Sequence, residues 1–459
     1  MQSNVEHERK LEAPGGFELP DLGGEPLEPR IFTSVYHDTP TRSLARSGIT
    51  LRRRTERGRS VWQLKLPLDG ARLELEEPGG PVGPPEKLRV LLRAHERSGV
   101  LAQVAELRTR RHGTLVVRNG AAAEVTVDEV SVMDAQRVSG EFVELEVELR
   151  EGDPAELAAI AKELEKAGAR GQALTPKLFR VLELEPPARP KAPFDALIAR
   201  LRGQLDEILA HDPGTRLGTD PESLHDMRVA VRRTRALLRA GRPLMTGDTQ
   251  MFELELKWLG TVLGNVRDLD VLLARLREDA ANLGEVDRAA AGRLLRSLDR
   301  RRSRARSTLL KALDSDRYGT LLDRFESTLV SLEPAETDET LAGLARREMK
   351  RLRRAVRALP EEPVDDELHA LRKRCKRARY AHELAGKDAV VARAKGLQDV
   401  LGEHQDSVVA EERLRALAQD APSDQALAAG LLIGRERVRQ DEARASWPNA
   451  WRKLDRTAR

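Results

Sequence analysis

The 459-residue chain is 40% hydrophobic and 34% charged, which excludes a disordered protein and predicts two or three folded domains. Aromatic residues make up only 3% of the chain, so a function that depends on many aromatic stacking surfaces is disfavoured. The small net charge of +4, the single cysteine (Cys375) and the lack of a long apolar run predict a soluble cytoplasmic protein, without intramolecular disulfides or a membrane partner.

Residues 1–184 are predicted to form mainly β-strands, because short alternating segments are separated by glycines and prolines. In chain order the expected strands are "VEHERKLE" (5–12), "IFTSVYHDT" (31–39), "GITLRRR" (48–54), "SVWQLKLPL" (60–68), "RLELEEP" (72–78), "GTLVVRNG" (113–120), "AAEVTVDEV" (122–130) and "EFVELEVELRE" (141–151). Two helices are expected between them, near residues 85–105 and 153–168.

Charged residues recur at every second position of these strands. Glu6, Glu8 and Lys10 share one face of the first strand, and most of the other strands repeat the pattern. A one-sided sheet with a solvated polar face is one interpretation. A closed barrel with its charged face inward is the other, and such an interior must be wet or hold a charged ligand. A phosphate chain with Mg²⁺ or Mn²⁺ fits it, because bases bind phosphate oxygens and carboxylates bind hard cations.

The ordered motifs of this half resemble a CYTH domain, the triphosphate tunnel metalloenzyme family. The matching motifs are "VEHERKLE" (E-x-E-x-K), "YHDT" (36–39), "LRRR" (51–54), "WQLKLP" (62–67), "RLELE" (72–76), "ELEVELREG" (144–152) and "TPKLFR" (175–180), in which Thr175 replaces the usual serine. The resemblance implies an eight-stranded antiparallel β-barrel tunnel that hydrolyses tripolyphosphate with Mg²⁺ or Mn²⁺.

The same resemblance implies roles for individual residues. Glu6, Glu8 and Lys10 would be catalytic. The implied metal ligands are Glu6, Glu8, Glu146 and Glu148, and the implied phosphate ligands are Lys10, Arg52, Arg54, Lys65, Arg118 and Lys177. The sequence does not decide which of Arg108, Arg110 and Arg111 faces the tunnel.

A proline-rich segment, "ELEPPARPKAPF" (183–194), predicts a linker over residues 185–194. Beyond it the apolar spacing is helical, so residues 195–459 are predicted to form an all-α domain. An internal repeat aligns "LHDMRVAVRRTRALLR" (224–239) with "LHALRKRCKRARYAHE" (368–383), and "LGTVLGNVRDLDVLLARL" (259–276) with "LQDVLGEHQDSVVAEERL" (397–414). The two repeats are therefore placed at about 195–325 and 338–459.

A basic stripe runs along one helix of each repeat. On a helix, His225, Arg228, Arg232, Arg235 and Arg239 fall within about 80° of one another. His369, Arg372, Lys376, Arg379 and Glu383 occupy the same offsets in the second repeat. Most charged helix faces are only solvated, but they mix signs so that i,i+4 ion pairs form. Five arginines against one acid in residues 224–239 predict a polyanion-binding surface instead.

The helical half resembles a CHAD domain, the conserved histidine α-helical domain, through its paired "LHxxR" and "LGxxxD" elements. The resemblance implies two four-helix bundles, related by pseudo-two-fold symmetry, that share a groove for inorganic polyphosphate. The implied ligands are His225, Arg228, Arg232, Arg235, Arg267, His369, Arg372, Lys376 and Arg379. It also suggests that the protein associates with polyphosphate granules.

Three alternatives stay open at this point. A tunnel that binds phosphate without turnover would give a non-catalytic polyphosphate-binding protein. Arginine-rich helices such as "RRRSRARSTLLK" (300–311) also attract the nucleic-acid backbone, so a nucleic-acid-binding protein is the second alternative. Some CYTH proteins are adenylyl cyclases, and that activity is the third.

Overall fold

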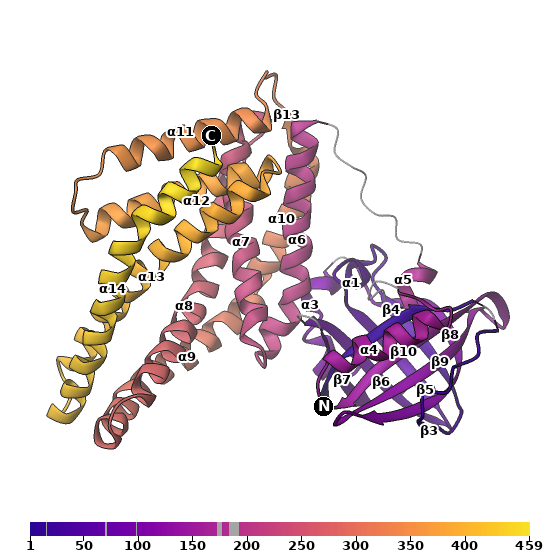
Figure 1. Cartoon of the computed structure of the whole chain (residues 1–459). Coiled ribbons are helices and arrows are strands. Elements are labelled where there is room, and N and C mark those ends of the chain that lie inside the picture. The colour runs from indigo at the N-terminus through magenta and orange to yellow at the C-terminus, as the bar shows by residue number, and fades with distance from the viewer. Residues whose placement is uncertain (15, 69–70, 98, 172–176, 183–191) are drawn as a thin grey trace. The chain divides into compact units, whose positions relative to one another are not determined.

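The computed structural model describes residues 1–14, 16–68, 71–97, 99–171, 177–182 and 192–459. The chain divides into two compact units (Figure 1). The sheet unit comprises Met1–Ala188 and Leu209–Ser223, and the helical unit comprises Arg189–Ile208 and Leu224–Arg459. An antiparallel sheet domain followed by a helical domain confirms the predicted fold class. Most of the predicted linker, residues 185–191, lies outside the described residues.

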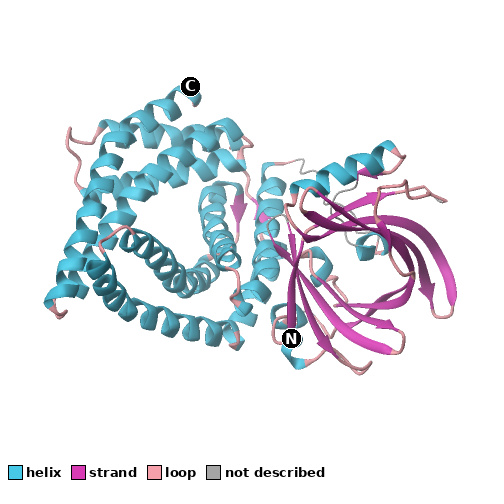
Figure 2. Cartoon of the chain, turned by 60° about the horizontal axis from the view of Figure 1, so that its bottom comes forward, coloured by secondary structure: helices cyan, strands magenta, loops and turns pink. Residues whose placement is uncertain are grey.

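Eleven antiparallel strands of the described residues form the curved sheet of the sheet unit (Figure 2). They are β1 (Gln2–Glu6), β2 (Glu8–Glu12), β3 (Glu25–Pro26), β4 (Arg30–Asp38), β5 (Thr50–Glu56), β6 (Arg59–Leu68), β7 (Ala71–Pro78), β8 (Ala102–Arg118), β9 (Ala121–Asp134), β10 (Arg137–Glu151) and β11 (Arg170–Gly171). Hydrogen bonds connect them in the order β1-β7-β6-β5-β4-β8-β9-β10-β2-β11, and β3 pairs with β8.

The structure corrects the predicted eight-stranded closed barrel in strand count and in closure. The first predicted strand is interrupted at His7 and becomes β1 and β2, and the two-residue strands β3 and β11 are additional. β1, at one end of the sheet, pairs with β7, whereas β2, near the other end, pairs with β10. His7 connects β1 to β2, so the chain itself links the two ends of the sheet. Among the described strands, no single one joins both ends by hydrogen bonds.

Helix α4 (Ala155–Lys166) covers part of the apolar face of the sheet. Its buried Leu157, Ile160 and Leu164 recur at helical spacing and pack against four strands. Their partners on β2, β8, β9 and β10 include Leu11, Val116, Val125, Val127, Leu145 and Val147. The apolar face is therefore the outer one here, and the alternating charged residues of the same strands lie on the inner face.

In the described part of the first 188 residues, four further short helices are present: α1 (Ser43–Arg46), α2 (Glu86–Arg89), α3 (Arg93–Glu96) and α5 (Lys177–Val181). The single helix expected near residues 85–105 is wrong, because β8 already begins at Ala102. β8 pairs with β4 on one side and β9 on the other, and such pairing overrides a local helical pattern.

The C-terminal part of helix α6 (Pro193–Leu217) belongs to the sheet unit. The fully buried His95 lies between two partners, with Nδ1 2.8 Å from the Ser43 hydroxyl and Nε2 3.0 Å from the Leu209 carbonyl oxygen. Burial lowers the pKa of His95 to about 4, so its ring is neutral at pH 7. Leu217 packs against the apolar core that contains Trp62. This part of α6 therefore contributes to the stability of the sheet unit.

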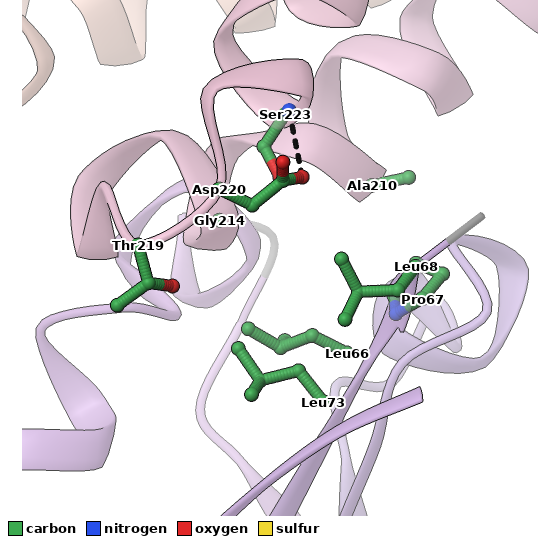
Figure 3. A pocket seen from close by; sticks show the side chains of 9 residues that line it. All are labelled: Leu66, Pro67, Leu68, Leu73, Ala210, Gly214, Thr219, Asp220 and Ser223. Atoms are coloured by element: carbon green, nitrogen blue, oxygen red, sulfur yellow. Dashed lines mark hydrogen bonds between the residues drawn. The ribbon is translucent and has the colours of Figure 1, made fainter. Parts of the chain in front are cut away.

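A small cavity lies beside this part of α6 (Figure 3). Its volume is about 10 Å³, which leaves room for one water molecule at most. Asp220 is the one charged residue that lines it, and this carboxylate accepts hydrogen bonds from the Ser223 amide and hydroxyl, each at 3.2 Å (Figure 3). The cavity is a packing feature next to a helix start, and it is not a candidate ligand site.

The helical unit contains the long helices of the chain. After α6 they are α7 (Pro221–Gly241), α8 (Gln250–Ala281), α9 (Glu285–Leu313), α10 (Asp316–Ser331), α11 (Leu341–Arg357), α12 (Asp365–Leu384), α13 (Asp388–Ala418) and α14 (Ser423–Thr457). A two-residue strand pair that the sequence does not predict, β12 (Met245–Thr246) with β13 (Glu333–Pro334), joins two loops. In the described part of the chain, every helix is too short or too polar to span a bilayer.

Candidate functional sites

The inner face of the sheet carries a cluster of bases and carboxylates. Lys10 on β2 lies opposite Glu146 on β10 in the strand register, so their side chains meet. The Nζ atom of Lys10 lies 2.6 Å from Glu146, 3.2 Å from Glu144 and 3.5 Å from Glu8. The Lys10 side chain is only 7% exposed, so these ion pairs form away from bulk water.

Glu146 is the centre of this cluster. It also contacts Lys177 of α5 at 3.0 Å and the guanidinium of Arg111 on β8. Burial alone would raise the pKa of Glu146, but Lys10, Lys177 and Arg111 hold it well below its usual value. Asp128 of β9 contacts Lys177 and, at 2.6 Å, Arg111. The predicted residues Lys10, Glu146 and Lys177 are thus brought together.

Arg111 is the arginine of segment 107–118 that faces inward. It lies opposite the buried Asp128 in the β8–β9 register. Arg108 and Arg110 are exposed, and Arg110 lies 3.8 Å from the exposed Glu129. The buried carboxylate opposite Arg111 therefore distinguishes it from the other two. Asp128 also belongs to this cluster. The sequence places it on the charged face of its strand, but no role was predicted for it.

Arg118 does not join this cluster. It lies seven residues from Arg111 on the same strand, and an odd separation puts the two side chains on opposite faces. Its guanidinium contacts Glu163 at 2.8 Å and Glu156 at 3.6 Å, both on α4. The predicted phosphate-binding role of Arg118 is therefore wrong for this structure, because its side chain packs on the outer face.

Arg52 and Lys65 form a second part of the inner face, on β5 and β6. Lys65 lies 2.5 Å from Glu6. Arg52 donates through Nε to Gln63 at 2.7 Å and through Nη1 to the Tyr36 hydroxyl at 3.2 Å. Gln63 and Tyr36 thus orient Arg52, a predicted phosphate ligand. Both residues are uncharged, so the pattern of charged residues did not identify them.

Arg54 also lies on this face, and its charge is only partly compensated. It lies over the ring of Phe32, 3.8 Å from the centroid, and pairs with Glu56 at 2.8 Å. Burial, together with the like charges of Arg52 and Arg30, lowers the pKa of Arg54 to about 10. An anion near Arg54 would offset this repulsion.

Glu6, Glu8 and Glu148 fit a divalent cation. Glu148 lies opposite Glu8 in the β10–β2 register, an arrangement of like charges that is unfavourable by itself. Burial raises the pKa of Glu148 to about 7, and the nearby Glu6 adds to this rise. Burial also raises the pKa of Glu6, with Glu74 adding to the rise against the effect of Lys65. Crowded carboxylate oxygens are the donors that a hard cation stabilises.

Glu146, the fourth predicted metal ligand, fits less well. Lys10, Lys177 and Arg111 already engage its oxygens. As the side chains are placed, no three His, Cys, Asp or Glu residues of the described chain form a ready metal-binding group. Glu6 and Glu8 contact lysines, and Glu148 contacts Arg150 at 2.7 Å, so a cation at these carboxylates would compete with those contacts.

In the helical unit, the basic stripes of α7 and α12 face each other. Met227, Ala230, Leu237 and Leu238 of α7 are buried on the opposite side, as the sequence predicts. Burial and the like charges of Arg372, Arg232 and Arg228 lower the pKa of Lys376 to about 8. Since these arginines come from both helices, the two stripes form one site with little compensating acid.

Several guanidinium groups in this site have unused hydrogen-bonding capacity. In the part of the chain that the structure describes, the buried Nε atoms of Arg228, Arg232, Arg372 and Arg379 lack a hydrogen-bond partner. Buried polar atoms normally have partners, so these cations are incompletely compensated within the protein. Arg228 is partly compensated by Asp268 of α8, at 3.0 Å from its Nη2 atom.

The remaining stripe residues differ in their surroundings. Burial and the like charge of Arg239 lower the pKa of Arg235, whereas Arg239 itself pairs with Glu253 at 3.3 Å. Glu383, which replaces Arg239 in the second repeat, lies 3.7 Å from Arg233 of α7. Arg379 lies over the Tyr380 ring, 4.8 Å from the centroid.

His369 lies near the stripe residues Arg372 and Lys376, and His225 and Arg267 are close to the site along the chain. Burial and the charge of Lys373 lower the pKa of His369, and Gln405 of α13 bonds to the His369 ring. His225 lies one helical turn before Arg228 on α7, and Arg267 directly precedes the aspartate that binds Arg228.

Comparison with known proteins agrees with this architecture. The CYTH domain model matches residues 4–175, and the CHAD domain model matches residues 199–415. The chain is 31% identical to the uncharacterized protein Rv2226 of Mycobacterium tuberculosis over 464 residues, which cover 93% of this chain and 90% of that protein. The chain therefore belongs to the proteins in which a CYTH domain is followed by a CHAD domain.

Two solved structures resemble part of the chain. PptA from Streptomyces chartreusis is 26% identical, and the match covers 57% of this chain and 100% of PptA with a TM-score of 0.49. The CHAD domain from the plant Ricinus communis is 27% identical, and the match covers 59% of this chain and 97% of that domain with a TM-score of 0.47.

Proposed function

We propose that this chain is an inorganic polyphosphate-binding protein whose sheet unit hydrolyses tripolyphosphate with Mg²⁺ or Mn²⁺. The observation that carries the binding function is the convergence of Arg228 and Arg232 with Arg372 and Lys376, which lowers the pKa of Lys376. Bringing cations together in a partly buried site is unfavourable unless an anion joins them. A flexible chain of phosphates supplies that charge along both helices.

The stripe geometry favours a linear polyanion. Arg228, Arg232, Arg235 and Arg239 extend for about 16 Å along α7, which a single phosphate ion would not occupy. Base-stacking residues are scarce, since aromatic residues make up only 3% of the chain. The site therefore suits a backbone of phosphates better than it suits nucleobases.

The sheet unit supports hydrolysis through the pairing of its bases and acids. Arg52, Arg54 and Lys65 would bind the phosphate oxygens, while Lys10 would orient the terminal phosphoryl group. A divalent cation held by Glu6, Glu8 and Glu148 would polarise phosphate oxygens and lower the pKa of a bound water molecule. Attack of water at the terminal phosphorus then breaks one phosphoanhydride bond and gives pyrophosphate and phosphate.

One set of assays tests both parts of the proposal. Purified protein should release phosphate from tripolyphosphate when Mg²⁺ or Mn²⁺ is added. This release should stop when the metal is chelated. Long-chain polyphosphate should displace single-stranded RNA at equal phosphate concentration. If tripolyphosphate stays intact with both metals, the protein would be a non-catalytic phosphate-binding protein. Preference for RNA would favour nucleic-acid binding, and cyclic AMP formed from ATP would favour an adenylyl cyclase.

A further inference from the structure

A helical glycine lies beneath one stripe arginine in each repeat. A Cβ atom added to Gly264 of α8 would lie 3.4 Å from Nε and 3.5 Å from Nη2 of Arg228. A Cβ atom added to Gly402 of α13 would lie 3.3 Å from Nη2 of Arg372. In both cases the nearest atoms belong to the guanidinium group. Each arginine therefore lies directly against the neighbouring helix, where an added Cβ atom would touch its guanidinium group.

The same arrangement occurs at corresponding positions of the two repeats. Each glycine directly follows a buried leucine, and an aspartate follows it by one helical turn. Asp268 lies 3.0 Å from Arg228, and the charge of Arg372 acts on Asp406, whose pKa burial raises. The glycine thus limits how closely the arginine approaches the helix, and in the first repeat Asp268 also contacts the arginine.

Several other helical glycines of the same unit behave differently. An added Cβ atom would meet nothing within 4 Å at Gly396, Gly430 or Gly434. At Gly260, one turn before Gly264, it would meet only the apolar side chain of Val231 at 3.4 Å. Glycine lowers helix propensity, so its presence inside a long helix calls for a reason. At Gly264 and Gly402 the reason is contact with a charged group of the site.

We propose that Gly264 and Gly402 are positioning residues for the polyphosphate site. They let Arg228 and Arg372 lie flat against α8 and α13, and this position keeps both guanidinium groups within the stripe. A larger side chain would push each guanidinium away from its aspartate and out of register with the stripe. This inference rests on the proposed binding of polyphosphate by the helical unit.

The test replaces both glycines in the full chain and measures binding of long-chain polyphosphate. Gly264→Leu with Gly402→Leu should weaken binding by about tenfold for each repeat, since each displaced arginine loses a charge-assisted contact. Gly264→Ala with Gly402→Ala requires shifts of only a few tenths of an ångström and should cause a smaller loss. The matched control is Gly396→Leu, an exposed glycine on α13 that should leave affinity unchanged.

A double-mutant cycle separates positioning from general damage to the fold. In a background with Arg228→Ala and Arg372→Ala, the leucine changes should cause no further loss of affinity. The alanine variants should also match or exceed the wild-type melting temperature, because alanine favours a helix more than glycine does.

The outcomes distinguish this inference from the function on which it rests. Wild-type protein that binds no polyphosphate would remove the proposed function, and this role for the glycines with it. Wild-type protein that binds, together with leucine variants of unchanged affinity, would overturn the glycine role alone. Equal losses with and without the two arginines would also overturn it, because the effect would not act through them.

Discussion

The two units differ in how far acidic residues neutralise their basic residues. In the sheet unit, Lys10 and Lys177 each contact several buried carboxylates, so the charges of the inner face largely balance. In the helical unit, Arg232 and Lys376 have mainly cations as neighbours, and both pKa values are lowered. Under the proposed function, the first arrangement would need a cation to release its bases for phosphate. The second would bind an anion without a metal.

The largest expected effect tests the metal requirement of the sheet unit. Glu6→Ala should lower the rate of tripolyphosphate hydrolysis by about 100-fold or more, because it removes a carboxylate of the predicted cation site. Binding of long polyphosphate by the helical unit should not change. Phosphate release measures the first effect, and titration with labelled polyphosphate measures the second.

The control for this change is Glu129→Ala, which removes a half-exposed carboxylate on the outer face. It should hydrolyse tripolyphosphate at the wild-type rate. Chelation of the metal should reproduce the Glu6→Ala phenotype in the wild type. Loss of polyphosphate binding on chelation would contradict the contrast between the units, since both would then depend on metal.

The next effect tests the metal-free unit. Changing Arg228, Arg232, Arg372 and Lys376 to alanine should weaken polyphosphate binding by at least about 100-fold. The slope of log affinity against log salt concentration should fall by about three, since each lost contact to a single chain contributes about 0.7. Titrations at several salt concentrations measure both quantities.

A matched control exists on α11, where three arginines and one lysine are exposed on one face. They are Arg346, Lys350, Arg354 and Arg357. Removing these four charges changes the net charge equally but leaves the paired stripes intact. A comparable loss of affinity in this control would mean that polyphosphate responds only to the overall charge of the unit.

A smaller effect follows from the pKa of Lys376, which burial and the neighbouring arginines lower to about 8. An anion favours the charged lysine, so binding takes up a proton above pH 8. Affinity should be constant below pH 8 and should fall by up to about tenfold per pH unit above it. Lys376→Arg keeps its charge and should remove this dependence. The same pH dependence in Lys376→Arg would assign it to another group.

The smallest effect concerns the boundary of the sheet unit. A fragment that ends at residue 188 loses the Leu209 carbonyl that pairs with His95, and the packing of Leu217. It should melt roughly 5 °C below a fragment that ends at residue 223, because a buried polar group loses its partner. Thermal unfolding followed by circular dichroism makes the comparison. Equal melting temperatures would show that this part of α6 adds nothing to the stability of the sheet unit.

The sequence alone determined which residues share a face. Strand alternation is local, so it placed Glu6, Glu8 and Lys10 together, and helical spacing did the same for Arg228 and Arg232. The repeat and the ordered motifs also indicated both domain families. These features depend only on spacing along the chain, which the sequence contains in full.

Only the tertiary structure decided which of those residues meet across elements. The register of β8 with β9 selected Arg111 over Arg108, and the pairing of Arg118 with α4 removed it from the inner face. If β8 is taken as one continuous strand, the odd separation of Arg111 and Arg118 puts their side chains on opposite faces. These contacts join segments that are far apart in the sequence. The stability of the contacts depends on burial and on opposite charge, and local spacing encodes neither.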